Sequence, residues 1–164
     1  MITQSELKKL VKYNKTTGLM TWAINMRKNQ VPAGKIVGSL NDSGYMRTKI
    51  NGKDYLCHRL IWLYVHGKWP ENLIDHINGI KTDNRIKNLR EANHKQNLSN
   101  VHKPSSRNKT GYLGVSYIVR DKIFMACIGV NLKTYNLGSY KTAKEASYAY
   151  LAAKKIYHTH AYQA

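Results

Sequence analysis

The stretch LIDHINGIKTDNRIKNLREANHKQNLSN (73–100) decides the fold of this chain. Its apolar start runs into Asp75 and His76, which predicts a strand that ends in a carboxylate and an imidazole. A polar loop and a second short strand follow, and Asn93 is a candidate N-cap for a helix that contains Asn97. The order strand, loop, strand and helix would bring Asp75 and Asn97 together.

These residue types suit the hydrolysis of a phosphodiester bond. The reaction needs a base for water and a cation that neutralises charge at the phosphate. The unperturbed pKa of histidine suits His76 to the role of base. Asp75 and Asn97 offer the oxygen ligands that Mg²⁺ prefers. Taken singly, each of these residues could instead serve as a turn or cap residue, since Asp and Asn favour such positions.

The charge of the chain predicts a polyanionic partner. Lys and Arg total 27 against 9 Asp and Glu, so the formal net charge is +18. A field of this size attracts nucleic acid and makes binding depend steeply on salt. The sequence contains no apolar run of membrane-spanning length, no signal peptide and no strongly amphipathic basic helix. We therefore expect a cytoplasmic protein without a membrane partner, in the host cell if the chain is phage-encoded.

The segments before the central stretch predict small sheets and two helices. Residues 5–14 are typical of a short helix with Ser5 as N-cap. The pair Asn51-Gly52 predicts a two-residue hairpin turn between arms at 45–50 and 54–57. Such a ribbon fits the major groove of DNA, although an ordinary hairpin with a solvated face is an equal alternative. HRLIWLYVH (58–66) predicts a buried helix.

The central stretch resembles the HNH nuclease family, in the branch that carries asparagine in place of the last histidine. The matching elements are IDHING (74–79), NLR (88–90) and QNLSN (96–100). The segments HRLIW (58–62), GKWP (67–70) and GSLNDSGY (38–45) are similar to HNH endonucleases of phage and mobile introns.

The resemblance implies a ββα-metal fold and a metal-dependent, homing-type endonuclease. His76 would activate water, and Asp75 and Asn97 would bind one Mg²⁺ or Mn²⁺ ion. Asn88 would hold the loop and orient His76 through hydrogen bonding. With asparagine at the last position the metal site is rich in oxygen, which favours magnesium or manganese over zinc.

Residues 111–164 predict a second module. Three strand-like segments precede an Ala-rich helix, which begins with a capping box formed by Thr142 and Glu145. GYLGVS (111–116) and the helix resemble the DNA-binding domain of plant ethylene-response factors. In that family a three-stranded sheet contacts the major groove. Ser116 and Ile118 replace the arginines that contact bases there, so the sequence preference of that family does not carry over.

The sequence thus predicts an α+β protein in three parts. An HNH domain spans 1–100, with its core at 58–100 and a β-rich DNA-contacting part at 1–57. A linker at 101–110 leads to the DNA-binding module at 111–164. The predicted DNA contacts are Arg47, Lys49, Lys53, Arg90, Lys95, Tyr117, Arg120, Lys122 and Lys133.

We expect the chain to hydrolyse duplex DNA by a one-metal mechanism and, as a monomer, to nick one strand. The alternative is a DNA-binding regulator with a vestigial nuclease site.

Overall fold

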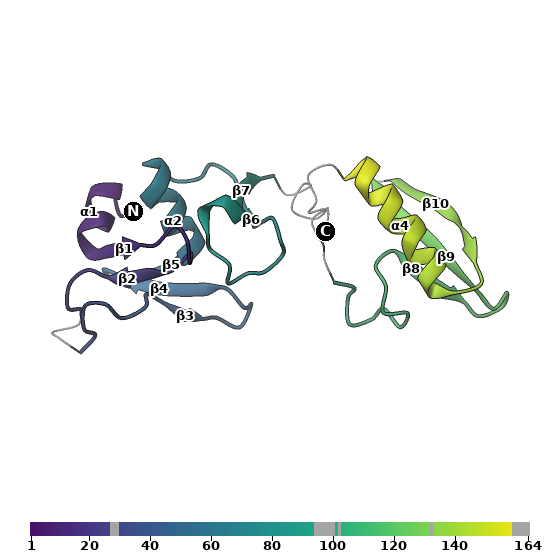
Figure 1. Ribbon diagram of the computed structural model, residues 1–164, viewed down its shortest axis with the longest axis horizontal. Helices are drawn as coiled ribbons and strands as arrows, with labels where there is room; N and C mark the ends of the chain where they lie inside the picture. The colour runs from purple at the N-terminus through teal and green to yellow at the C-terminus, as the bar shows by residue number, and fades with distance from the viewer. Residues whose placement is uncertain (27–29, 94–100, 102, 132, 159–164) are drawn as a thin grey trace. The chain divides into compact units, whose positions relative to one another are not determined.

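The computed structural model describes residues 1–26, 30–93, 101, 103–131 and 133–158 (Figure 1). The chain divides into two compact units, 1–93 and 94–164. Both units mix helices with small antiparallel sheets. None of the helices in the described part of the chain is long and apolar enough to cross a membrane.

Unit 1 begins with helix α1 (Gln4–Leu10), which is shorter than the predicted helix over 5–14. The N-cap is Thr3 and not Ser5. The Thr3 hydroxyl accepts from the Glu6 amide, and the Glu6 carboxylate accepts from the Thr3 amide. The helix ends at Leu10 because the next residues form β1 (Val11–Tyr13), which pairs antiparallel with β2 (Met20–Trp22). Tertiary strand pairing therefore overrides the helical periodicity.

The predicted hairpin is present. Strands β3 (Ser39–Leu40), β4 (Met46–Ile50) and β5 (Lys53–Leu56) form an antiparallel sheet in that order. Its turn has positive φ at Asn51 (49°) and Gly52 (78°), as expected for this residue pair.

Helix α2 (Cys57–His66) directly follows β5 and forms the centre of unit 1. Its inner face contributes Cys57, Leu60, Ile61 and Leu63 to the core, where they are almost completely buried. The rest of this core comes from the surrounding elements and includes Leu7, Val11, Ile50, Ile74 and Leu89. The site described below is therefore built on a closely packed core.

The central stretch forms a strand pair. Strand β6 (Leu73–His76) pairs antiparallel with β7 (Leu89–Ala92), and the short 3₁₀ helix η1 (Ile86–Asn88) precedes β7. This confirms the two predicted strands. The predicted helix after Asn93 lies outside the described residues, so the complete ββα-metal arrangement stays a prediction.

Unit 2 contains the predicted three strands and helix. Strands β8 (Val115–Ile118), β9 (Ile123–Val130) and β10 (Lys133–Tyr140) form an antiparallel sheet with β9 in the middle. Helix α4 (Ala143–Tyr157) crosses one face of this sheet (Figure 1) and begins with the predicted capping box. Its small residues pack on the sheet in a core that includes Val115, Ala126, Ile128, Ala146 and Ala153.

Candidate active site and nucleic-acid interface

Asp75 and His76 are the last two residues of β6. Both are buried, with exposed fractions of 7% and 4%. The burial follows from their place between the core strand residue Ile74 and the loop that returns to β7. A charged carboxylate and an imidazole are costly to bury without partners. The hydrogen bonds and ring contacts of Asp75 and His76 therefore indicate the role of each side chain.

The His76 ring is held from several sides. Its Nε2 atom lies 2.9 Å from Oδ1 of Asn84, another buried side chain. The rings of His58 and Tyr45 pack against it, with centroids at 5.2 and 5.9 Å. Burial lowers the pKa of His76, and the bond to Asn84 and the charge of Asp75 partly oppose this shift. A lowered pKa keeps the ring neutral near neutral pH, as a general base requires.

His58 is a second buried histidine at this site. It lies in the first turn of α2, and its ring meets the His76 ring nearly perpendicularly, at 87°. Burial, with smaller contributions from His76 and Arg59, lowers the pKa of His58 to about 3. Among the described residues its buried Nδ1 atom has no hydrogen-bond partner. A neutral imidazole therefore lies directly beside His76.

Asn88 holds the loop between the two strands. Its Oδ1 accepts from the Asn78 amide at 3.0 Å, and its Nδ2 donates to Oδ1 of Asn78 and to the carbonyl of Asp83. These contacts connect Asn88 to two residues of the loop, and the role that the resemblance implies for Asn88 stays a prediction. The side chain that bonds the His76 ring is Asn84, a loop residue that was not among the predicted site residues.

Asp75 is paired with Arg90, its cross-strand neighbour on β7. The Nε and Nη2 atoms of Arg90 donate to Oδ2 of Asp75 at 3.0 and 2.8 Å. Arg90 was predicted to contact DNA, and the structure directs its guanidinium at this carboxylate. Most of this ion pair is buried, since the Arg90 side chain is 24% exposed and the Asp75 side chain 8%.

The described residues supply one of the two predicted metal ligands. Asp75 is a hard oxygen donor of the kind that Mg²⁺ uses with few protein ligands and several waters. Asn97, the second predicted ligand, and Lys95, a predicted DNA contact, lie outside the described residues. Within the described part of the chain no group of three or more His, Cys, Asp or Glu side chains is arranged to hold a metal.

The predicted basic contacts of unit 1 lie on the β4–β5 hairpin. Arg47 and Lys49 are more than half exposed, and each lies 3.8 Å from an Asp54 carboxylate oxygen. Lys53 is exposed at the start of β5.

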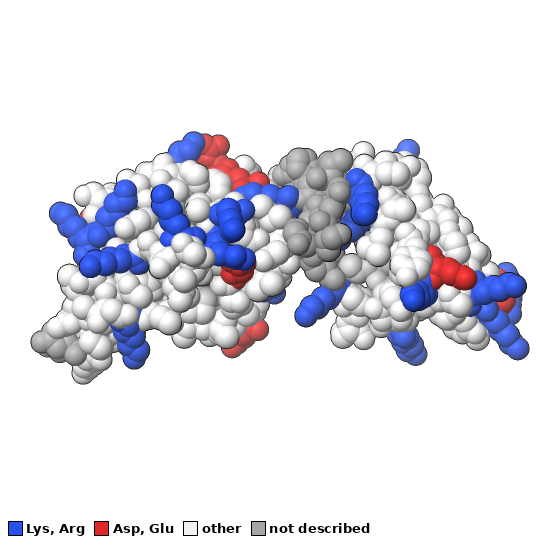
Figure 2. Space-filling view, in the orientation of Figure 1, with Lys and Arg blue, Asp and Glu red and all other residues white. Residues whose placement is uncertain are grey.

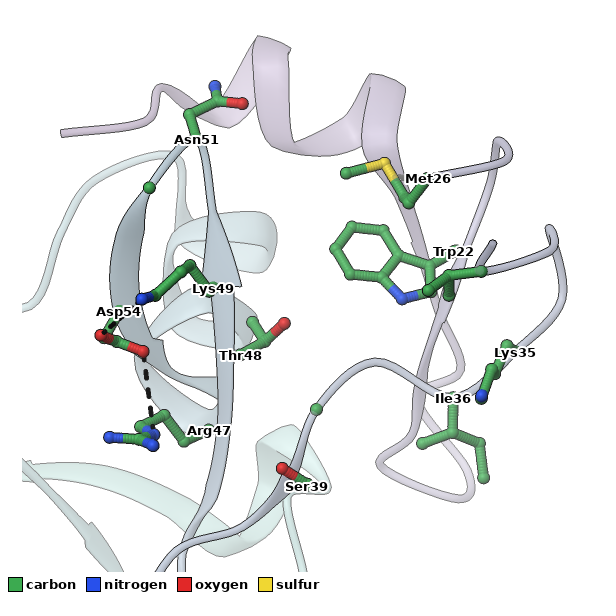
Figure 3. A pocket seen from close by; sticks show the side chains of 13 residues that line it. Trp22, Met26, Lys35, Ile36, Ser39, Arg47, Thr48, Lys49, Asn51 and Asp54 are labelled. Carbon is green, nitrogen blue, oxygen red and sulfur yellow. Dashed lines mark ion pairs between the residues drawn. The ribbon is translucent and has the colours of Figure 1, made fainter. Parts of the chain in front are cut away.

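A groove of about 690 Å³ lies beside this hairpin. Figure 3 shows Trp22 and Met26 on one side of it, with Thr48 and Lys49 on the other.

The four predicted contacts of unit 2 have different settings. Arg120, which pairs with Asp121, and Lys122 are exposed in the β8–β9 turn, and Lys133 is exposed at the start of β10. The Tyr117 ring packs against Phe124, which borders the core under α4. Tyr117 therefore lies at the margin of the helix-covered face of the sheet. In Figure 2, Lys and Arg side chains are spread over the visible face of each unit.

A family model matches part of unit 1 and the residues that follow it. Residues 55–99 match the model of a family described as HNH endonuclease. No curated protein and no solved structure matches the chain. The matched segment contains Asp75, His76, Asn84 and Asn88, so the buried site described above lies within it. Residues 55–99 are therefore similar to an HNH endonuclease domain.

Proposed function

We propose that the chain is a metal-dependent endonuclease that cuts duplex DNA, as homing enzymes of phage and mobile introns do. The observation that carries this proposal is the buried pair Asp75–His76, with the His76 ring bonded to Asn84, inside the segment that matches HNH endonucleases. The net charge of +18 supports a polyanionic substrate.

His76 acts as the general base in this proposal. Its lowered pKa leaves the ring neutral, so it can take a proton from the attacking water. Asp75 and Asn97 would hold one Mg²⁺ or Mn²⁺ ion, which supplies the positive charge that the phosphate and the leaving oxygen need. Asn88 keeps the loop between β6 and β7 closed around this site.

DNA would be bound by both units. The exposed cations of the β4–β5 hairpin and those at the strand ends of unit 2 would contact phosphates and set the register on the duplex. A monomer brings one active site to the duplex, and the expected product is a nick. The proposed place of action is the cytoplasm, in the host cell if the chain is phage-encoded.

Cleavage of supercoiled plasmid with Mg²⁺, with Mn²⁺ and with a chelator tests the proposal. We expect metal-dependent conversion to the nicked form that His76→Ala abolishes with DNA affinity nearly unchanged. His66→Ala is the matched control, because His66 is an exposed histidine at the far end of α2. Tight DNA binding without cutting under any metal would favour a DNA-binding regulator and contradict the nuclease.

A further inference from the structure

The hydrogen bond between His76 and Asn84 selects one form of the His76 ring. Oδ1 of an amide side chain only accepts, so Nε2 of His76 carries the hydrogen in the neutral ring. The lone pair of the neutral ring is then on Nδ1. Both side chains are 4% exposed, so this bond has little competition from water.

Asn84 is itself fixed through its backbone by a residue far away in the sequence. The Tyr13 hydroxyl donates to the Asn84 carbonyl at 3.0 Å and accepts from the Ile86 amide at 2.9 Å. One phenol therefore holds the backbone on both sides of Arg85, directly after Asn84. Burial raises the pKa of Tyr13, so its hydroxyl keeps the proton that it donates here.

Gly18, in the turn between β1 and β2, supports the same segment. Its φ is +75°, which favours glycine, and its Cα lies directly against the peptide between Asn84 and Arg85. A Cβ at this position would lie 2.7 Å from the Asn84 carbonyl carbon and closer still to the Arg85 nitrogen. Any side chain at residue 18 would therefore clash with the backbone of Asn84 and Arg85 and force this segment and the β1–β2 turn apart.

The residue before Asn84 is anchored as well. Asp83 binds the Arg85 guanidinium and accepts from Nδ2 of Asn78 at 2.8 Å. The bond to Arg85 is the main reason that the pKa of Asp83 falls to about 2, so the carboxylate is charged and holds both partners. Asn84 thus has little freedom to move away from the His76 ring.

We propose that Asn84 is a positioning residue that holds His76 in the form with the hydrogen on Nε2. We further propose that the β1–β2 hairpin, through Tyr13 and Gly18, is a working part of the nuclease site although it lies outside the matched segment 55–99. This inference rests on the proposed function for its catalytic meaning. The hydrogen bond to Asn84 also predicts which ring nitrogen of His76 carries the hydrogen, whether or not the chain cuts DNA.

Nitrogen NMR of the full, metal-free chain tests the geometry. With ¹⁵N-labelled histidine, the two ring nitrogens of His76 report which one carries the hydrogen, and His76→Ala identifies the signals. We expect the Nε2–H form in the wild type, a mixture of both forms in Asn84→Leu, and the Nε2–H form again in Asn84→Asp, because a carboxylate also accepts. A wild type in the Nδ1–H form, or an Asn84→Leu variant that keeps pure Nε2–H, would overturn the proposal.

Single-turnover cleavage at saturating DNA tests the consequence. Asn84→Leu, Tyr13→Phe and Gly18→Ala should each lower the cleavage rate about tenfold or more, with DNA affinity within about twofold of wild type. Tyr64→Phe is the control, since the Tyr64 ring packs beside Tyr13 and no described hydrogen bond uses its hydroxyl. Wild-type cleavage rates in Asn84→Leu and Tyr13→Phe would overturn the inference.

The two readouts separate the possible failures. If the wild type has the Nε2–H form but cuts no DNA, the proposed function is contradicted and the proposed ring geometry is not. If Asn84→Leu does not fold, as judged by circular dichroism, Tyr13→Phe decides, because it keeps the size of the side chain. A folded Tyr13→Phe variant with unchanged His76 signals and unchanged cleavage would show that the hairpin does not position the base.

Discussion

Arg90 places two hydrogen bonds on one carboxylate oxygen of Asp75, across the β6–β7 pair. The register makes these residues direct cross-strand partners, so the ion pair is a consequence of how the two strands align. The carboxylate is almost fully buried, and a buried charge that loses its partner is strongly destabilising. The pair therefore matters for the stability of unit 1 as well as for the site.

We predict that Arg90→Gln lowers the free energy of unfolding by about 1–3 kcal/mol in the absence of metal. The reason is the loss of two charge-assisted hydrogen bonds to a buried carboxylate. Urea unfolding of Arg90→Gln, Asp75→Asn and the double variant measures the coupling. The double variant should recover much of the loss, and strictly additive single effects would show that the pair is not coupled.

The carboxylate of Asp75 gives a second prediction, which concerns metal binding. Asp75→Asn should weaken Mn²⁺ binding by about tenfold or more, because a divalent ion depends strongly on a charged oxygen ligand. Titration of Mn²⁺ into the full chain by calorimetry measures this. Asp54→Asn is the control, since Asp54 lies on the exposed hairpin. Equal Mn²⁺ affinity in wild type and Asp75→Asn would remove Asp75 from the ligand set.

Local signals predicted a large part of the fold. Asn51-Gly52 predicted the hairpin because both positions need positive φ, and Thr142 with Glu145 predicted the start of α4 because a capping box is a local contact. The periodicity of 58–66 predicted α2, whose apolar face forms the core of unit 1. Each of these elements is determined by neighbouring residues.

The parts that the sequence did not reveal depend on distant contacts. Asn84 lies in a segment that the sequence predicts to be a polar loop, and the residue that fixes it, Tyr13, lies 71 positions earlier. His58 sits beside His76 only after α2 packs against β6, so no spacing in the sequence brings them together. In the sequence, a buried asparagine in a polar loop has no local signal that distinguishes it from an exposed turn residue.

His58 predicts a pH dependence of stability. Its pKa is about 3 in the folded chain, against 6.5 as its ordinary value, so the unfolded chain binds the extra proton between these values. The free energy of unfolding should therefore fall as the pH drops below about 6.5, by on the order of 1 kcal/mol per pH unit from this group. At higher pH the contribution is constant.

Urea unfolding of wild type and His58→Phe at about pH 7 and about pH 5 isolates this contribution. His76 also has a lowered pKa and contributes in the same direction in both proteins, so the difference between them reports His58. We expect the variant to lose less stability than wild type between the two pH values. Parallel losses would mean that His58 is as solvated in the folded chain as in the unfolded one.

The exposed cations of the hairpin make a prediction about DNA binding. If Arg47 and Lys49 each neutralise one phosphate, then Arg47→Gln/Lys49→Gln should reduce the slope of log affinity against log salt by about 2. Their ion pairs with Asp54 are exposed and 3.8 Å long, so they compete weakly with a phosphate. Fluorescence anisotropy with a labelled duplex, at a series of salt concentrations, measures the slope. Lys68→Gln is the matched control because Lys68 is an exposed lysine that also lies 3.8 Å from a carboxylate oxygen but is outside the hairpin. If both variants show the wild-type slope, the hairpin does not contact phosphates, and the positive charge that holds DNA lies elsewhere on the chain.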